Sequence, residues 1–362
     1  MERLVAAAVE RGARVIHIKA GDVFRARIDG KMVKLSSQVL AAEDVRQLAL
    51  RLISNERDRE NLDSLRDYDT SWDLADVGRF RVNILRQRGK FMIIMRVIPL
   101  AVPTLDELNL PPVLGEIAEL PRGIVLITGA VGTGKSNTLA AMVGWLNSRL
   151  QKHIVTLEDP IEFLHPDDVS TVTQREIGVD TPSFRDGLRA ALRQDADVIL
   201  IGEMRDRETV ATAIRAAELG LLVITTMHSA TAVGAIGQLL GSFEDDELDL
   251  VRSRVADTLM AVIAQRLLPR SGTDTLIPAV EVLRVTGAVR ECILNARPAE
   301  EIMELMEQGR EAYGMRTMQQ SLRELVQIGL VDYELAKSAA PSPSDFELVM
   351  ETLADDGPHG GQ

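Results

Sequence analysis

Residues 123–136 read GIVLITGAVGTGKS, an apolar run that leads into a complete G-x-x-x-x-G-K-[ST] phosphate-binding loop at 129–136. The run predicts a buried strand, and the residues from Asn137 onward predict a helix. Glycine at three loop positions lets the backbone turn its N–H groups toward an anion, and the helix start favours negative charge. Lys135 is expected to reach the β/γ-phosphates, and the Ser136 hydroxyl to hold Mg²⁺. The first ligand to expect is therefore a polyphosphate, held by Gly129, Ala130, Val131, Gly132, Thr133, Gly134, Lys135, Ser136 and Asn137.

Length and composition limit the class of protein. A chain of 362 residues exceeds the usual single core, and 46% hydrophobic residues are enough for two. The formal net charge of −13 argues against a nucleic-acid coat, so no nucleic-acid partner is expected. The single cysteine, Cys292, excludes an internal disulfide and a multi-cysteine zinc site, and it is expected to be buried. Because no stretch reaches the length of a membrane span, we expect a cytoplasmic protein that touches a membrane only through a partner.

The first hundred residues predict a small α+β domain at 1–99. Alternating apolar residues favour strands at 15–18 and 23–28 with a turn at 29–30, and helical spacing follows at 42–53. A second hairpin is expected from 79–84 and 91–98, which flank a turn at 87–90.

A proline-rich segment at 100–112 is typical of a linker and is interpreted as a hinge. Beyond it, short β-branched runs alternate with helical segments as far as about residue 271, which predicts a parallel α/β sheet. The predicted strands are 124–127, 153–157, 171–173, 198–201 and 222–226. Residues 113–335 are assigned to this domain and its C-terminal helices, and 336–362 to a flexible tail.

Carboxylates follow two of the predicted strands. Glu203 ends the run at 198–201, where a Walker B acid would help to hold Mg²⁺, although a solvated charge at a strand end is the alternative. Glu158, Asp159 and Glu162 follow the run at 153–157, and Pro160 favours a turn there over a helix. Glu162 is the candidate for polarising an attacking water. For each of the three carboxylates taken singly, a surface turn is the commoner meaning.

Two further features complete the predicted site. His228 ends a third apolar strand, where its ring could hydrogen-bond a γ-phosphate, although a lone histidine at a strand end is usually structural. Five arginines crowd the hairpin at 79–96, and one or more could act as an arginine finger across a domain or subunit boundary. Charges on an edge strand also deter aggregation, which is the alternative reading. The five are Arg79, Arg81, Arg86, Arg88 and Arg96.

The order of these segments resembles the type II/IV secretion ATPase superfamily. The segments are GAVGTGKS at 129–136, TLEDPIEFLH at 156–165, the stretch from Thr173 to Thr209, and AAELGLLVITTMHSATA at 216–232. Within the superfamily the chain is most similar to type IV pilus retraction ATPases. The Gly-Glu-Met-Arg-Asp segment at 202–206 and the single cysteine favour this branch over extension motors. Relatives carry a second histidine where Leu221 stands, and their retraction motif is matched only in part by residues 288–293.

The resemblance implies a homo-hexameric, Mg²⁺-dependent ATPase with a PAS-like N-terminal domain and a RecA-like P-loop domain. It implies catalytic roles for Glu162, Glu203 and His228, Mg²⁺ binding near Ser136 and Glu203, and nucleotide contacts from Glu158, Asp159, Arg81, Arg86 and Arg96. The implied function is pilus retraction in twitching motility, on an inner-membrane platform protein and with a paralogous pilus ATPase as a further candidate partner. The alternatives are an extension or type II secretion ATPase, a nucleotide-gated accessory ring with weak turnover, and a DNA translocase.

Overall fold

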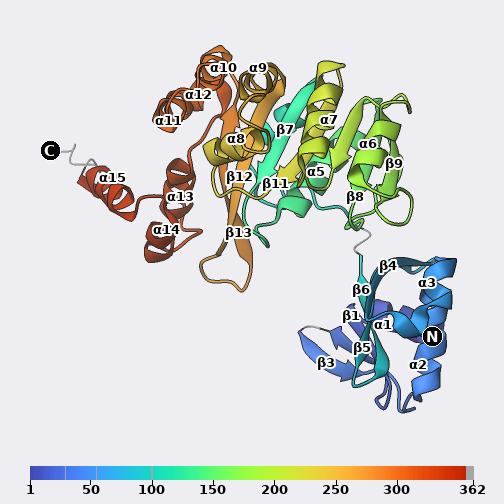
Figure 1. Ribbon diagram of the computed structural model, residues 1–362. Coiled ribbons are helices and arrows are strands. Elements are labelled where there is room, and N and C mark those ends of the chain that lie inside the picture. The colour runs from blue at the N-terminus through green and yellow to red at the C-terminus, as the bar shows by residue number, and fades with distance from the viewer. Residues whose placement is uncertain (29, 54, 99–100, 356–362) are drawn as a thin grey trace. The chain divides into compact units, whose positions relative to one another are not determined.

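The structure is a computed structural model that describes residues 1–28, 30–53, 55–98 and 101–355. The chain divides into two compact units. The first unit contains residues 1–102 together with the short segments 159–164 and 176–181, and the second contains the rest of the chain. Figure 1 labels the helices and strands of both units.

The first unit is a six-stranded antiparallel sheet with helices. The strand order is β3-β2-β1-β6-β5-β4. Alternation along β5 and β6 buries Phe80, Val82 and Ile93 on one face, where α1 and α2 contribute further apolar side chains. The elements are α1 (Glu2–Glu10), β1 (Ala13–Lys19), β2 (Arg25–Ile28), β3 (Lys31–Lys34), α2 (Ala42–Leu52), α3 (Glu56–Glu60), a 3₁₀ turn (Leu62–Ser64), β4 (Asp67–Leu74), β5 (Gly78–Gln87) and β6 (Lys90–Val97).

These elements confirm the predicted α+β character, the helix at 42–53 and the hairpin at 79–98. The hairpin turn contains Arg88 and Gly89, both with positive φ (51° and 75°). Asp29, half of the other predicted turn, lies outside the described residues, as does Pro99 at the predicted domain boundary. The strands β3 and β4 were not predicted from the sequence.

The second unit is built on a seven-stranded sheet that alternates with helices. Its first part comprises α4 (Val113–Ala118), β7 (Gly123–Thr128), α5 (Lys135–Asn147), β8 (His153–Glu158), β9 (Thr171–Glu176), α6 (Phe184–Ala191), β10 (Val198–Ile201), α7 (Arg207–Glu218), β11 (Leu222–Met227), α8 (Ala232–Leu240), α9 (Leu248–Thr258), β12 (Leu259–Pro269) and β13 (Leu276–Arg284). Six helices follow: α10 (Gly287–Leu294), α11 (Ala299–Gln308), α12 (Arg310–Tyr313), α13 (Met318–Gln327), α14 (Tyr333–Ala339) and α15 (Pro343–Asp355). All five predicted strands are present, whereas β12 and β13 were not predicted.

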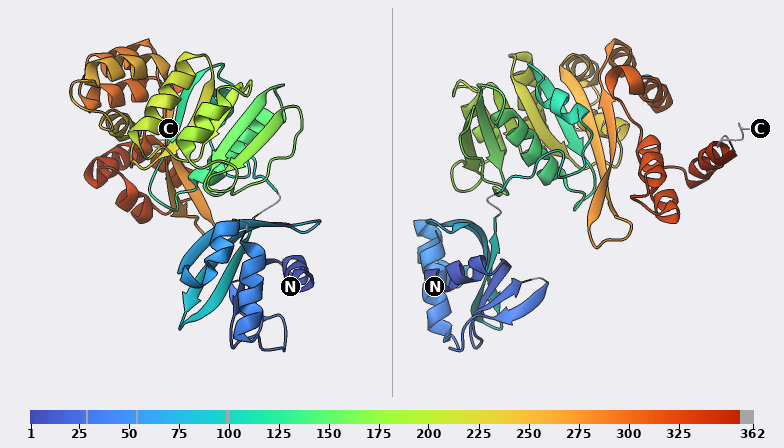
Figure 2. Two further views of the ribbon diagram at one scale, coloured as in Figure 1. Left: turned by 45° about the vertical axis from the view of Figure 1, so that its right-hand side comes forward. Right: turned by 180° about the vertical axis from the view of Figure 1, so that it is seen from behind.

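The strand order β13-β12-β7-β11-β10-β8-β9 decides which loops meet. The strands β12, β7, β11, β10 and β8 run parallel to their neighbours, so their carboxyl ends share one edge of the sheet. Helices α4 and α5 pack on one face, while α6, α7 and α8 lie on the other (Figures 1 and 2). The α/β fold class predicted from the sequence is confirmed.

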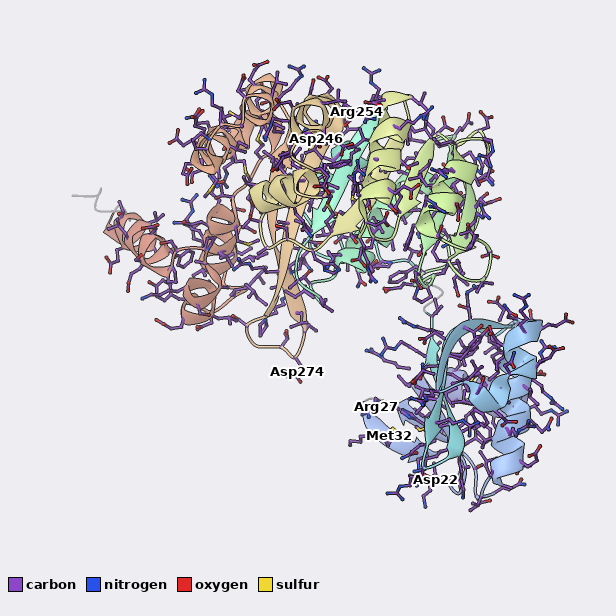
Figure 3. The ribbon with its side chains drawn as sticks, viewed as in Figure 1. Asp22, Arg27, Met32, Asp246, Arg254 and Asp274 are labelled. Carbon is purple, nitrogen blue, oxygen red and sulfur yellow. The ribbon has the colours of Figure 1, made fainter. Side chains whose placement is uncertain are left out.

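An ion pair links two helices of this unit, and β12 and β13 form a long hairpin. Arg254 of α9 bonds Glu218 at the end of α7, with 2.6 Å between Nε and Oε1, and so links the two helices. Arg254 is labelled in Figure 3, as is Asp274, which lies in the turn between β12 and β13. Ala288–Ile293, the part-matched retraction motif, lies on α10, and Cys292 there is buried as expected.

Two predicted segment boundaries are wrong. The segment assigned to a linker, 100–112, is anchored to the second unit, because its residues Leu105 and Leu110 are buried in the core beneath the second sheet. The segment assigned to a flexible tail, 336–362, forms the end of α14 and then α15 as far as residue 355. Phe346 of α15 is 1% exposed and lies 6.1 Å from the Tyr333 ring, centroid to centroid. Proline and glycine marked both segments as loose, but each segment buries some of its apolar side chains, such as Leu110 and Phe346. Residues 356–362 lie outside the described residues.

Candidate functional site

The phosphate-binding loop joins a wholly buried strand to a helix. β7 ends at Thr128, and the loop glycines Gly129, Gly132 and Gly134 have φ of 150°, 83° and 86°. A Cβ at Gly129 would lie 2.5 Å from the Thr133 hydroxyl and 2.6 Å from a backbone carbonyl, so no side chain fits there. Helix α5 begins at Lys135 without a side-chain cap. Its first N–H groups are therefore oriented for an anion, as the sequence predicted.

Lys135 lies folded over this loop. Its side-chain amine donates to the carbonyls of Gly129 (2.8 Å) and Ala130 (2.9 Å), and lies 3.5 Å from His228 Nδ1. The residue is 9% exposed, and this burial lowers the pKa of Lys135, while the Glu203 carboxylate raises it again in part. An ammonium group is thus held where a β- or γ-phosphate of a ligand in the loop would lie.

Glu203 and His228 meet at the same edge of the sheet. His228 Nε2 lies 2.7 Å from Glu203 Oε1, and Arg205 bonds the other oxygen of Glu203 at 2.7 Å. Partial burial alone would raise the pKa of Glu203, but the hydrogen bond from Arg205 and the charge of His228 hold that pKa below its usual value. The structure therefore connects Lys135, His228 and Glu203 in one chain of contacts.

The strand order explains the place of His228. β11 lies between β7 and β10, so Glu203 is not on the strand next to the phosphate loop. The Thr226 hydroxyl, near the end of β11, donates to the Gly202 carbonyl at 2.6 Å and draws the ends of β10 and β11 together. His228 consequently bridges the lysine and the carboxylate, a contact that the sequence analysis did not predict.

The carboxylates after β8 divide between the two units. Glu158 ends β8 and accepts hydrogen bonds from Thr156 (2.7 Å) and Gln174 (3.0 Å). Asp159 and Glu162 are exposed and belong to the segment 159–164, which is described with the first unit. The peptide bond between Asp159 and Pro160 is cis.

The five arginines of the hairpin separate into different environments. Arg86 donates to the carbonyls of Asp63 (2.8 Å) and Leu65 (3.2 Å), and its guanidinium stacks on Phe91 at 4.3 Å from the ring centroid. Arg86 is therefore held against the segment that precedes β4, and its contact with nucleotide stays a prediction. Arg81 and Arg96, in contrast, are exposed and lie directly opposite each other on β5 and β6.

Glu176 is a functional candidate that sequence reasoning missed. Within the first unit it is 3% exposed and accepts hydrogen bonds from Ser71 (2.5 Å) and Arg79 (3.0 Å). It also accepts from the backbone N–H of Ile161 at 3.3 Å, next to Glu162. The signal was its place in the stretch from Thr173 to Thr209, to which no role was assigned. Arg79 is thus occupied by Glu176 and Asp73.

The residues at the edge of the sheet fit a nucleotide with a hard cation. The tight cradle at Gly129 and the uncapped start of α5 suit phosphate oxygens. Ser136, in the first turn of α5, and Glu203 supply the hydroxyl and carboxylate oxygens that Mg²⁺ prefers.

A family comparison decides what kind of protein carries this site. The family described as "Type II/IV secretion system protein" matches residues 1–341. The chain belongs to this family. Among curated relatives, the chain is 37% identical over 343 residues to the Pseudomonas aeruginosa "Type IV pilus retractation ATPase PilT", covering 95% of this chain and 98% of the relative. It is 39% identical over 322 residues to a "Twitching motility protein" of Neisseria gonorrhoeae, covering 89% and 85%.

A solved structure agrees with this assignment. The pilus retraction motor PilT with bound ADP matches with a TM-score of 0.86 at 37% identity, covering 96% of this chain and 99% of that one. Together these findings confirm the resemblance stated from the sequence motifs, and they place the chain among secretion and pilus ATPases. In the part of the chain that the structure describes, no helix is both long and apolar enough to cross a membrane.

Proposed function

We propose that this protein is a Mg²⁺-dependent ATPase that powers type IV pilus retraction as a homo-hexamer. The observation that carries the proposal is the chain of contacts from the phosphate loop through Lys135 and His228 to Glu203. It occurs in a member of the secretion ATPase family that is similar over nearly its whole length to a named retraction ATPase.

Each residue has a distinct role in the proposed reaction. The loop N–H groups and Lys135 bind the β/γ-phosphates, and Ser136 and Glu203 hold Mg²⁺, directly or through water. When bound, Mg²⁺ would neutralise charge on the phosphate oxygens. Glu162 orients the attacking water, and His228 positions Glu203 relative to the γ-phosphate. We also propose Glu158 and Asp159 as contacts of the nucleotide.

We propose Arg81 and Arg96 as the arginines that reach a nucleotide across a subunit boundary. Like charges directly opposite each other on neighbouring strands are unfavourable, so an anion brought to this pair would relieve the repulsion. On this proposal the protein is cytoplasmic and reaches the inner membrane through a pilus platform protein, with a paralogous pilus ATPase as a second candidate partner.

The test is steady-state ATP hydrolysis with Mg²⁺ and with EDTA. Lys135→Ala, Glu162→Gln and Glu203→Gln are each expected to lower turnover by about a hundredfold or more, because each removes an interaction with transferring phosphate, metal or water. Lys152→Ala and Glu208→Gln, which alter exposed ion pairs elsewhere on the second unit, are the matched controls and should retain turnover. Turnover that is insensitive to EDTA, or that survives all three site substitutions, would contradict the proposal.

The direction of work requires a deletion strain. Loss of retraction leaves excess surface pili and no twitching, whereas loss of an extension or secretion ATPase does not leave excess pili. A nucleotide-gated accessory ring remains the second candidate because Leu221, which directly precedes β11, stands where relatives carry a second histidine. It would show tight nucleotide binding with little turnover of the purified parent protein.

A further inference from the structure

Glu281 is a buried carboxyl group to which the proposed reaction assigns no role. It lies on β13 and is 5% exposed. Its Oε1 accepts a hydrogen bond from the backbone N–H of Ala232 at 3.1 Å, at the first residue of α8. Burying a carboxyl group in a sheet is costly, so its presence there calls for a specific interaction.

The sheet register places Glu281 in one row with Thr128. Ala264 of β12 pairs with Thr128 of β7 on one side and with Glu281 of β13 on the other. Cross-strand partners point to the same face of a sheet, so the three side chains share the face that α8 covers. The small side chain of Ala264 separates the two polar ones.

Thr128 and Glu281, at the two ends of this row, both hydrogen-bond the segment that joins β11 to α8. Thr128 accepts from the Ser229 N–H at 2.7 Å and donates to the Ser229 carbonyl at 2.8 Å, while Glu281 holds Ala232 three residues later. The loop between β11 and α8 begins with His228, which contacts both Lys135 and Glu203. Because Thr128 precedes the phosphate loop, one polar row links the P-loop strand, the histidine loop and β13.

The loop also closes tightly on α8. Thr231 caps the helix by accepting from the Gly234 N–H at 3.0 Å. A Cβ at Gly234 would lie 2.7 Å from the Ser229 hydroxyl, so the loop folds directly against the first turn of the helix. Displacement of the start of α8 would therefore move Ser229 and the neighbouring His228.

We propose that Glu281 is a positioning residue for ATP turnover. By holding the start of α8 it fixes, together with Thr128, the loop that presents His228 to Lys135 and Glu203. This inference rests on the proposed ATPase function. The role needs the acceptor oxygen and not the negative charge, since either form of the carboxyl group can accept from Ala232.

The experiment compares Glu281→Leu with Glu281→Gln in the full-length chain. The leucine variant leaves the Ala232 N–H without its acceptor, and we expect kcat per folded molecule to fall about fivefold or more, the size of one lost buried hydrogen bond. The dissociation constant for ADP should change by less than about twofold, because the loop N–H groups and Lys135 are untouched. The glutamine variant retains an acceptor oxygen and should retain at least about half of the parent turnover.

Controls separate positioning from stability. Ile277→Ala lies on the same strand, is 1% exposed and removes apolar packing away from the loop, so it should lower the melting temperature without lowering kcat per folded molecule. Hydrogen exchange of the peptide containing Ala232 should accelerate in the leucine variant and not in Ile277→Ala.

Three results would overturn the inference: parent-like turnover in Glu281→Leu, equal impairment in Glu281→Gln, or unchanged exchange at Ala232. Failure of the proposed ATPase function is distinct, since the parent protein itself would then show no turnover that Lys135→Ala abolishes.

Discussion

At the scale of single residues, Glu281 also makes the stability of the protein depend on pH. Burial raises the pKa of Glu281 to about 7, against the partial opposition of the Ala232 hydrogen bond and the charge of Arg266. The carboxyl group is therefore harder to ionise in the folded chain than in the unfolded one. Its contribution to stability is complete below the unfolded pKa and is lost as pH rises through about 7.

We expect Glu281→Gln to remove this dependence, since an amide does not titrate in this range. Between pH 5 and pH 8 the parent should lose about 2 kcal/mol of unfolding free energy relative to the variant. Urea unfolding at the two pH values measures the difference. If the unfolding free energies of parent and variant differ by the same amount at both pH values, burial does not raise the pKa of Glu281.

Residue patterns predict roles from adjacent sequence but not contacts between residues that are distant in sequence. The roles expected for Lys135 and Glu203 follow from adjacent sequence, namely a loop motif and a strand end. Arg86 is predicted to contact nucleotide from its arginine-rich hairpin, but its hydrogen bonds to the carbonyls of Asp63 and Leu65 were not predicted. Such a contact depends on how the turn before β4 packs, which the arginine pattern does not encode.

At the scale of elements, α15 belongs to the fold although its sequence is typical of a tail. Phe346 is 1% exposed and packs with Met318, Leu322 and Val331. Leu348, two residues later on the same helix, is 64% exposed. The helix therefore buries one face only.

We expect Phe346→Ala to destabilise the second unit by about 3 kcal/mol or more, since it removes a buried ring and leaves a cavity. Leu348→Ala is the matched control and should change stability by less than about 0.5 kcal/mol. Thermal unfolding of both variants tests this. Equal, small effects would mean that α15 is detached in solution.

The strands β12 and β13 show a different limit of sequence reasoning. Their side chains are buried along most of their length, so the alternation that identifies a half-exposed strand is missing. Four of the five predicted strands, β7, β8, β10 and β11, share that burial, but β-branched runs and turn residues around them provided the signal. The prediction of a linker at 100–112 was wrong for a different reason. Its prolines indicated an exposed segment, although Leu105 and Leu110 are buried.

At the scale of the whole molecule, the proposed hexamer would build each nucleotide site from residues of two neighbouring protomers. If Arg96 acts on a neighbour's nucleotide, then Arg96→Ala and Lys135→Ala protomers are each inactive alone but complement each other. A protomer with an intact phosphate loop would receive Arg96 from a Lys135→Ala neighbour.

We therefore expect a mixture of the two variants to recover a measurable fraction of parent ATPase activity, whereas neither does so separately. Mixing Lys135→Ala with Glu203→Gln is not expected to recover activity, because both residues belong to one unit of the same chain, and this is the control. Absence of recovery in a mixture that forms mixed assemblies would place Arg96 on its own protomer's nucleotide or outside the site.

The sequence by itself determined the phosphate loop, the α/β class of the second unit, the family and the strand-end carboxylates, because each depends on neighbouring residues. Tertiary structure alone decided that β11 lies between β7 and β10, so that His228 bridges Lys135 and Glu203. It also decided that Thr128 and Glu281, 153 positions apart, share one row of the sheet. Strand order and register set these relations, and both arise from burial across the whole sheet, which no local pattern records.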